Sequence, residues 1–315
     1  MKVSIVIPVY FNEDNLRILY EDLKDKFINK INFEYEIVMV NDGSKDKSYD
    51  VMKELSKIDN NIKIISLSRN FGSHAAILCG LSSCTGDCAV VKAADLQEPT
   101  ELLLEMVEKW KEGNNVVLAV RDGRDESKSQ SFFAKTYYRI VKKTSLREMP
   151  DEGFDVYLVD KKVIKVLKIL DERNSALTCQ ILWSGFKTSK VYYRRLAREI
   201  GTSTWTLRKK LRLVTDTFFS FSSLPIKIVT FVGAFSLCVS FVWAAVLLVS
   251  KLAGAISETG WTSLFIFNLF SFGLIMMTLG ILGEYLWRTF DASRNRPPYI
   301  IEESNLNQDK NEHQS

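Results

Sequence analysis

Residues 2–9 read KVSIVIPV, a continuous run that is rich in β-branched residues. Comparable runs follow at 35–40, 62–67, 88–92 and 116–120, and helical patterns such as 15–27 and 47–58 separate them. Alternating strand and helix patterns are typical of βαβ units. We therefore predict an α/β fold with a mostly parallel sheet for residues 1–200.

In a parallel sheet of this kind, ligands bind beyond the carboxyl ends of the strands. The segments that follow the predicted strands are 8–13, 41–44, 69–72 and 92–99, and polar residues gather in them. The first loop contains no G-x-G-x-x-G pattern, which disfavours a dinucleotide-binding Rossmann domain. A turn of sequence Asn41-Asp42-Gly43-Ser44 follows the second strand, where Asp42 is suited to bind a ribose or a base. Asx-Gly turns are also common for conformational reasons alone.

The segment Ala93-Ala94-Asp95-Leu96-Gln97-Glu98-Pro99 carries the sharper signal. It places a carboxylate at the mouth of a central strand, a costly position without a purpose or a partner. Mg²⁺ typically takes one or two protein carboxylates and completes its shell with phosphate oxygens and water. Asp95, with Gln97, is therefore a candidate ligand for a divalent cation that bridges a diphosphate. The alternative is that Asp95 caps the helix that follows.

The last third of the chain differs in character. Residues 224–249 contain one charge, Lys227, and residues 261–282 contain none, so each run is long enough to span a bilayer. Two buried helices of a soluble core are the alternative. Lys and Arg are dense before the first run and present after the second, so the positive-inside rule places both termini and the first domain in the cytoplasm. We predict a transmembrane hairpin at 224–288, a partly disordered cytoplasmic tail at 289–315, and loss of order from Glu302 onward.

Residues 201–223 form a juxtamembrane segment in which basic and large apolar residues alternate. We interpret its core, 205–221, as an amphipathic helix at the membrane surface, with an ordinary core-packed helix as the alternative. The net charge of +4 is too small to indicate a nucleic-acid partner. Five cysteines without C-x-x-C spacing and only two histidines indicate reduced thiols and no Cys/His metal site.

Several of these segments occur together and in order: SIVIPVYFNEDN, EIVMVNDGSKDKS, LSRNFGSHAAILCGL, AADLQEP and the paired apolar helices. Over about residues 3–290 the chain resembles the polyprenyl-phosphate glycosyltransferases of glycosyltransferase family 2, the bactoprenol- and dolichol-phosphate enzymes. The resemblance implies a GT-A fold and a divalent metal, Mg²⁺ or Mn²⁺. The family's aspartate-rich motif commonly reads Asp-Ala-Asp-Leu-Gln, and Ala93 stands here in place of its first aspartate.

The resemblance also implies roles for individual residues. It matches Pro8, Tyr10, Glu13 and Asp42 to donor binding, and Asp155 to the aspartate near the reacting sugar. Arg198, Ser203 and Lys209 match the stretch that receives the acceptor's phosphate, and Arg121 and Arg124 lie in a loop that also meets phosphate. His74 is expected to have a structural role near the donor.

The implied reaction moves a sugar from a UDP-linked nucleotide sugar to polyprenyl phosphate at the cytoplasmic membrane face. It is metal-dependent, proceeds with inversion, and is catalysed by Asp95 and Asp155 in a homotetramer. A processive polysaccharide synthase is the second enzymatic reading, although the Q-x-x-R-W segment typical of such enzymes is missing from the sequence. A catalytically weakened membrane scaffold of the same fold is the third, motivated by Ala93.

Overall fold

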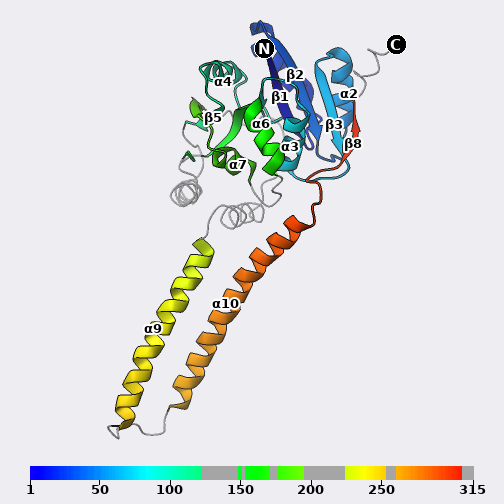
Figure 1. Cartoon of the computed structure of the whole chain (residues 1–315). Coiled ribbons are helices and arrows are strands. Elements are labelled where there is room, and N and C mark those ends of the chain that lie inside the picture. The colour runs from blue at the N-terminus through cyan, green and yellow to red at the C-terminus, as the bar shows by residue number, and fades with distance from the viewer. Residues whose placement is uncertain (123–147, 151–152, 171–175, 195–223, 253–259, 307–315) are drawn as a thin grey trace. The chain divides into compact units, whose positions relative to one another are not determined.

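The computed structural model describes residues 1–122, 148–150, 153–170, 176–194, 224–252 and 260–306 of the 315-residue chain. Contacts divide the chain into two units. One comprises Met1–Val214 together with Pro297–Ser315, and the other is Thr215–Arg296. The first holds an α/β domain and the second two long helices (Figure 1).

An eight-stranded sheet forms the centre of the first unit, in the order β7-β5-β6-β4-β1-β2-β3-β8. Strands β1 to β4 are parallel to one another, β5 and β7 are parallel to each other, and β6 and β8 are antiparallel to their neighbours. The bounds are β1 Lys2–Val9, β2 Glu34–Asn41, β3 Ile62–Leu67, β4 Cys88–Val91, β5 Val116–Arg121, β6 Phe154–Asp160, β7 Thr188–Tyr193 and β8 Ile301–Ser304. The predicted mostly parallel α/β sheet is confirmed.

Helices cover both faces of the sheet (Figure 1). One apolar core joins α1, α2 and α4 to the sheet, whereas α3 packs on the other face together with α6 and α7. The bounds are α1 Leu16–Lys26, α2 Ser48–Ile58, α3 Ser73–Ser83, α4 Leu102–Lys111, α6 Lys161–Leu170 and α7 Leu177–Trp183, with a short 3₁₀ turn, η1, at Ile28–Lys30.

The two covered faces explain why the strands read as unbroken apolar runs. Ile5 and Ile7 of β1 belong to the core under α1, α2 and α4. Val6 points the other way, toward α3, where a Cβ on Gly80 would lie 2.4 Å from its side chain. Since successive side chains alternate between faces and both faces are buried, every position favours an apolar residue.

Strand directions place most of the polar loops at one edge of the sheet. The parallel strands β1 to β5 end there, at Val9, Asn41, Leu67, Val91 and Arg121. The antiparallel strand β6 begins there, because Tyr157 pairs with Val91. We call this the carboxyl edge, and it brings together loops that are far apart in sequence.

The opposite, amino edge of the sheet carries a buried carboxylate. Glu36 on β2 is 1% exposed and accepts a hydrogen bond from Ser4 Oγ at 2.6 Å. Its carboxylate also pairs with Lys63 at 2.9 Å and Lys2 at 3.2 Å. Burial alone would raise the pKa of Glu36, but hydrogen bonds from Ser4, Thr85 and Lys63 lower it to about 2.

The C-terminal tail contains an ordered strand that the sequence did not reveal. β8 pairs antiparallel with β3, with Leu67 opposite Ile301 and Ile65 opposite Ser304. The prediction that order is lost from Glu302 is therefore wrong for Glu302 to Ser304. A short run of alternating polarity has too little local signal to identify a strand whose partner lies hundreds of residues away.

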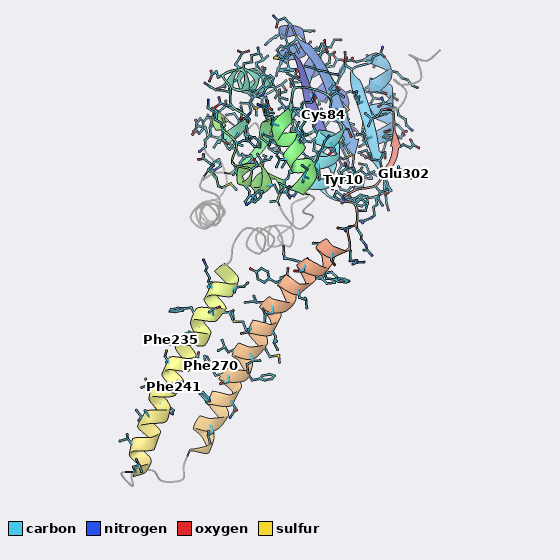
Figure 2. The ribbon with its side chains drawn as sticks, in the orientation of Figure 1. Tyr10, Cys84, Phe235, Phe241, Phe270 and Glu302 are labelled. Carbon is cyan, nitrogen blue, oxygen red and sulfur yellow. The ribbon has the colours of Figure 1, made fainter. Side chains whose placement is uncertain are left out.

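The second unit consists of α9, Leu224–Leu252, and α10, Trp261–Ser293. Within them, Ile226–Trp243 and Phe270–Ser293 are long and apolar enough to cross a membrane. Neither stretch contains a buried residue among those described, and Phe235, Phe241 and Phe270 are exposed (Figure 2). Helices of a soluble core would bury such side chains. α10 continues beyond the predicted end at residue 288.

Candidate active site

Asp42 lies just beyond β2 and is almost completely buried. Its two carboxylate oxygens accept hydrogen bonds from the backbone N–H groups of Phe71, at 2.7 Å, and Gly72, at 2.9 Å. Burial raises the pKa of Asp42, while these two hydrogen bonds and the charge of Arg69 oppose the rise. Asp42 therefore joins the turn after β2 to the loop after β3 and fixes the start of α3.

Gly43 brings the same two segments into direct backbone contact. Its φ is +65°, a conformation that side chains rarely adopt. A Cβ at this position would lie 2.5 Å from the carbonyl carbon of Arg69 and 2.7 Å from the backbone nitrogen of Asn70. Only glycine permits this approach, so the Asn-Asp-Gly turn has a packing function beyond its conformational preference.

The loop after β1 stacks beside this pair. The backbone N–H of Phe11 donates to Ser44 Oγ at 3.1 Å, and Glu13 Oε2 accepts from the backbone N–H of Lys47 at 2.7 Å. Tyr10 lies beyond β1 with its ring against that of Phe11 and remains partly exposed (Figure 2). Pro8 lies inside β1, paired with Val40. Tyr10 thus presents an aromatic surface at the carboxyl edge, whereas Glu13 helps to order the first loop.

Asp95 lies in the loop after β4 and is partly exposed. Its Oδ1 accepts a long hydrogen bond, 3.4 Å, from the backbone N–H of Gln97. Leu96 between them has a φ of +57°. α4 begins at Leu102 with Glu101 as its N-cap, so Asp95 does not cap that helix. The structure therefore excludes the alternative role of Asp95 as a helix cap.

The buried side chain of Lys92 stabilises the Asp95 loop. It is 0% exposed, and its ammonium donates a 2.7 Å hydrogen bond to the carbonyl oxygen of Glu98. Burial lowers its pKa, while the nearby charges of Glu98, Asp22 and Asp95 act in the opposite direction. A buried ammonium is costly unless it is compensated. Through its hydrogen bond to Glu98, Lys92 joins the beginning of the Asp95 loop to its end.

Arg121 and Asp155 meet at the same edge. Arg121 ends β5, Asp155 is the second residue of β6, and their side chains form an ion pair. The Arg121 side chain is 12% exposed and that of Asp155 is 55% exposed. Arg121 Nε is buried and has no hydrogen-bond partner among the described residues. The pair thus combines a largely fixed cation with a carboxylate that faces solvent.

The remaining predicted acceptor residues, Arg124, Arg198, Ser203 and Lys209, lie outside the described residues, as does the predicted interfacial helix at 205–221. Their roles stay predictions.

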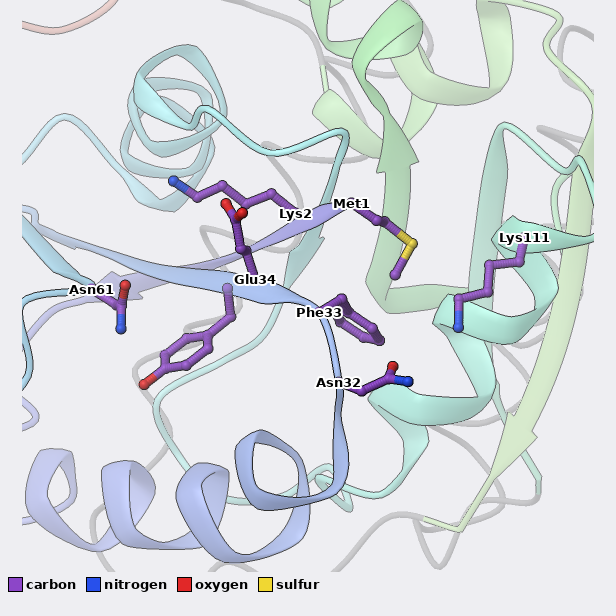
Figure 3. A pocket seen from close by; sticks show the side chains of 8 residues that line it. Met1, Lys2, Asn32, Phe33, Glu34, Asn61 and Lys111 are labelled. Carbon is purple, nitrogen blue, oxygen red and sulfur yellow. The ribbon is translucent and has the colours of Figure 1, made fainter.

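A hollow of about 840 Å³ opens at the amino edge, not at the carboxyl edge. Met1, Phe33, Asn61 and Lys111 line it, together with the beginnings of β1 and β2 (Figure 3). It lies at the other ends of the strands from Asp42 and Asp95, so it is separate from the candidate site.

The residues at the carboxyl edge suit a divalent cation that takes most of its coordinating oxygens from a bound ligand and from water. The described residues contain no cluster of three or more metal-binding side chains. Asp95 offers one carboxylate with solvent access, which suits Mg²⁺ or Mn²⁺ only when phosphate oxygens and water supply the other ligands. Gln97, which is 9% exposed, lies beside it. Ala93 contributes no ligand.

The amino-acid sequence identifies the class of protein to which this site belongs. The chain is a member of Glycosyl transferase family 2, whose model matches residues 4–167. The uncharacterized glycosyltransferase YkcC of Bacillus subtilis is 38% identical to it, over 96% of this chain and 94% of that protein. The SfII prophage-derived bactoprenol glucosyl transferase of Shigella flexneri is 32% identical, over 96% of this chain and 98% of that protein.

Among solved structures, the chain is similar to glucosyl-3-phosphoglycerate synthase from Mycobacterium tuberculosis in complex with Mn²⁺, UDP and glucosyl-3-phosphoglycerate. The TM-score is 0.46 at 16% identity, over 69% of this chain and 77% of that one. The family membership and the sheet topology together define a GT-A fold, as the sequence predicted.

Sequence reasoning missed two contributors to the site. Lys92 directly follows the apolar strand Cys88–Val91, and a charge at that place was a usable signal. The contact between the β3 loop and the C-terminal segment had no comparable signal, because it joins residues on either side of the two apolar helices.

Proposed function

We propose that this protein transfers a hexose from a UDP-linked sugar to polyprenyl phosphate at the cytoplasmic face of a membrane, with a divalent cation and inversion at the anomeric carbon. The observation that carries the proposal is the position of Asp95, a solvent-accessible carboxylate at the mouth of a central parallel strand of a family 2 glycosyltransferase. A relative named as a bactoprenol glucosyl transferase matches nearly the whole chain, which supports a lipid phosphate as acceptor.

On the donor side, the nucleoside lies against the first loop and the Asp42 turn, with Tyr10 as a flat apolar surface. Asp95, with Gln97 beside it, would hold the cation. A cation bound there would offset the negative charge that the leaving diphosphate develops. Lys92 keeps the Asp95 loop closed, so the carboxylate is in place before the donor arrives.

On the acceptor side, the lipid phosphate needs little help from a general base. Its second ionisation lies near pH 6, so it is already mostly an oxyanion at neutral pH. Arg121 is held near the site and, with Arg124, Arg198, Ser203 and Lys209, binds this phosphate by charge-assisted hydrogen bonds. Asp155 orients the sugar or the acceptor. A single in-line displacement follows, with no covalent enzyme intermediate.

The apolar helices α9 and α10 anchor the enzyme, with both termini in the cytoplasm by the distribution of Lys and Arg. A homotetramer is the assembly that the family resemblance favours. A processive synthase is disfavoured because the sequence lacks a Q-x-x-R-W segment.

The proposal is tested by transfer from a panel of radiolabelled nucleotide sugars to polyprenyl phosphate, with full-length protein in nanodiscs and added Mn²⁺. We expect one UDP-sugar to label the lipid and Asp95→Asn to abolish the labelling. Glu105→Gln, an acidic position on α4 away from this loop, is the matched control and keeps its activity. Undiminished transfer by Asp95→Asn would remove Asp95 from the mechanism. A wild-type protein that neither transfers nor takes up any nucleotide sugar in calorimetry would instead be the weakened scaffold.

A further inference from the structure

The segment that follows α10 in sequence returns to the catalytic domain and packs beside the loop that Asp42 holds. We call residues Tyr299–Asn305 the C-terminal strap. It contains β8 and lies along the free edge of β3, on the side of the sheet away from β2 (Figure 1). Figure 2 shows Glu302 of the strap and Tyr10 of the first loop toward the same end of the domain.

The N-terminal end of the strap contacts the first residue of the loop after β3. The backbone N–H of Ser68 donates to the carbonyl oxygen of Ile300 at 3.0 Å. The register of the β3–β8 pair shifts between Ser66 and Leu67, directly before this contact. The strap therefore determines where the Ser68–Gly72 loop leaves the sheet.

The C-terminal end of the strap is fixed by Asn305, whose side chain makes hydrogen bonds to the backbone of β3. Its Oδ1 accepts from the backbone N–H of Ile64 at 2.9 Å, and its Nδ2 donates to the carbonyl oxygen of Ile62 at 3.2 Å. Its own backbone N–H donates to the carbonyl oxygen of Ile64 at 3.2 Å. Three hydrogen bonds from one residue hold the end of a four-residue strand that would otherwise fray.

Both helices that flank the loop also contact the strap. Lys53 of α2 pairs with Glu303 at 3.2 Å, and Tyr49 hydrogen bonds to the same carboxylate. On the other face of the sheet, Cys79 of α3 hydrogen bonds to Tyr299. α2 follows the Asp42 turn and α3 begins at the end of the Ser68–Gly72 loop. The strap thus links both elements to β3.

The Ser68–Gly72 loop is consequently fixed from three directions. Ile300 holds its start, the Asp42 carboxylate holds its end at Phe71 and Gly72, and Gly43 packs against its middle. Two of these contacts belong to the Asn-Asp-Gly turn at the predicted donor site. The third belongs to a segment that the chain reaches only after both apolar helices.

We propose that the C-terminal strap is a positioning element for donor binding: it holds the Ser68–Gly72 loop, and through it Asp42, in the conformation that receives the nucleoside of the donor. This inference rests on the proposed function and adds a requirement for chain that lies beyond the apolar hairpin. Pro297 and Pro298 precede the strap and restrict its backbone, which reduces the entropy lost when it docks.

The test compares Asn305→Ala with two control variants in full-length protein in nanodiscs. Asn60→Ala removes an exposed asparagine from the turn before β3, outside the strap. Glu36→Gln weakens the same sheet at its amino edge, so it controls for a general loss of stability. The first measurement is amide hydrogen exchange at Ser68, Phe71 and Gly72. The second is calorimetric binding of UDP in the presence of Mn²⁺.

We expect Asn305→Ala to speed exchange at these three amides and to weaken UDP binding by about fivefold, the effect of losing about one net hydrogen bond. Neither control variant should do both. Unchanged exchange in Asn305→Ala would refute the proposal that the strap holds the Ser68–Gly72 loop. Faster exchange with unchanged UDP affinity would refute a role of the strap in donor binding. An equal loss of UDP affinity in Glu36→Gln would show that the loss in Asn305→Ala results from lower overall stability and not from the strap. Wild-type protein that binds no UDP would refute the proposed donor, and the exchange measurement would still decide whether the strap holds the loop.

Discussion

Arg121 and Asp155, residues 34 positions apart in the chain, form an ion pair at the carboxyl edge of the sheet. Arg121 is nearly buried, whereas more than half of the Asp155 side chain is exposed. In the proposed function, the acceptor phosphate would compete with Asp155 for the guanidinium, because both are anions that match its geometry. We therefore expect the ion pair to open when the proposed acceptor binds, with phosphate taking the place of the carboxylate.

Replacing Asp155 with Asn should separate a catalytic role from a structural one. The pair is partly solvent-exposed, so its loss should change the free energy of unfolding by less than about 1 kcal/mol. We expect kcat for lipid glycosylation to fall by about tenfold or more, equivalent to about 1.4 kcal/mol of transition-state stabilisation. The matched control is Glu54→Gln, which breaks the exposed Arg17–Glu54 pair between α1 and α2. A variant with wild-type kcat would exclude Asp155 from the reaction.

Gly43 and Gly113 allow the backbone contact at the site to be tested directly. Both have positive φ, +65° and +88°, so alanine at either position costs about 1 kcal/mol or slightly more in backbone strain. Only at Gly43 would the new Cβ also meet the backbone of Arg69, since nothing lies within 4 Å of a Cβ on Gly113. We expect Gly43→Ala to lower the melting temperature further than Gly113→Ala and to weaken UDP binding. Equal effects of the two variants on stability and binding would contradict the contact.

Ala93 stands where the resembling family carries an aspartate, so Ala93→Asp should strengthen cation binding. A second carboxylate near Asp95 adds charge to a site that otherwise relies on one. We expect the Mn²⁺ concentration for half-maximal transfer to fall by about tenfold. Ala93→Asn adds similar volume without charge and should leave this concentration unchanged or raise it. If the aspartate variant requires more Mn²⁺ than the wild type, position 93 does not face the cation.

Glu36 should make the stability of the domain depend on acid pH. Its pKa is lowered to about 2 in the folded chain, from an ordinary value of 4.5. A lowered carboxyl pKa contributes stability that is fully present above pH 4.5 and is lost as the pH falls toward 2. Glu36→Gln should therefore cost roughly 3 kcal/mol at neutral pH and much less near pH 2, measured by denaturant unfolding. Glu34→Gln, at an exposed position of the same strand, should show no such difference between the two pH values.

The loops that follow β1 to β5 meet at the carboxyl edge of the sheet, and the sequence pattern is sufficient to predict this. Apolar runs of strand length with intervening helical patterns identified β1 to β5, and parallel strands necessarily present their following loops at one edge. Asp42 and Asp95 were therefore expected at that edge, and the structure places both there. The direct contacts of Asp42 were not predictable, since its partners are the backbone N–H groups of Phe71 and Gly72, and any sequence supplies such groups.

The sequence by itself determined the elements whose signals are local: alternating strands and helices, the two long apolar helices, and an acidic residue after a buried strand. The family motifs added the class of chemistry. Tertiary structure alone decided that Arg121 pairs with Asp155, that Lys92 closes the Asp95 loop, and that Ile300 and Asn305 join the edge of β3. These contacts depend on which distant segments the folded sheet brings within hydrogen-bonding range. The hydrophobic periodicity of the sequence is a local property and does not predict contacts between residues that are far apart in the chain.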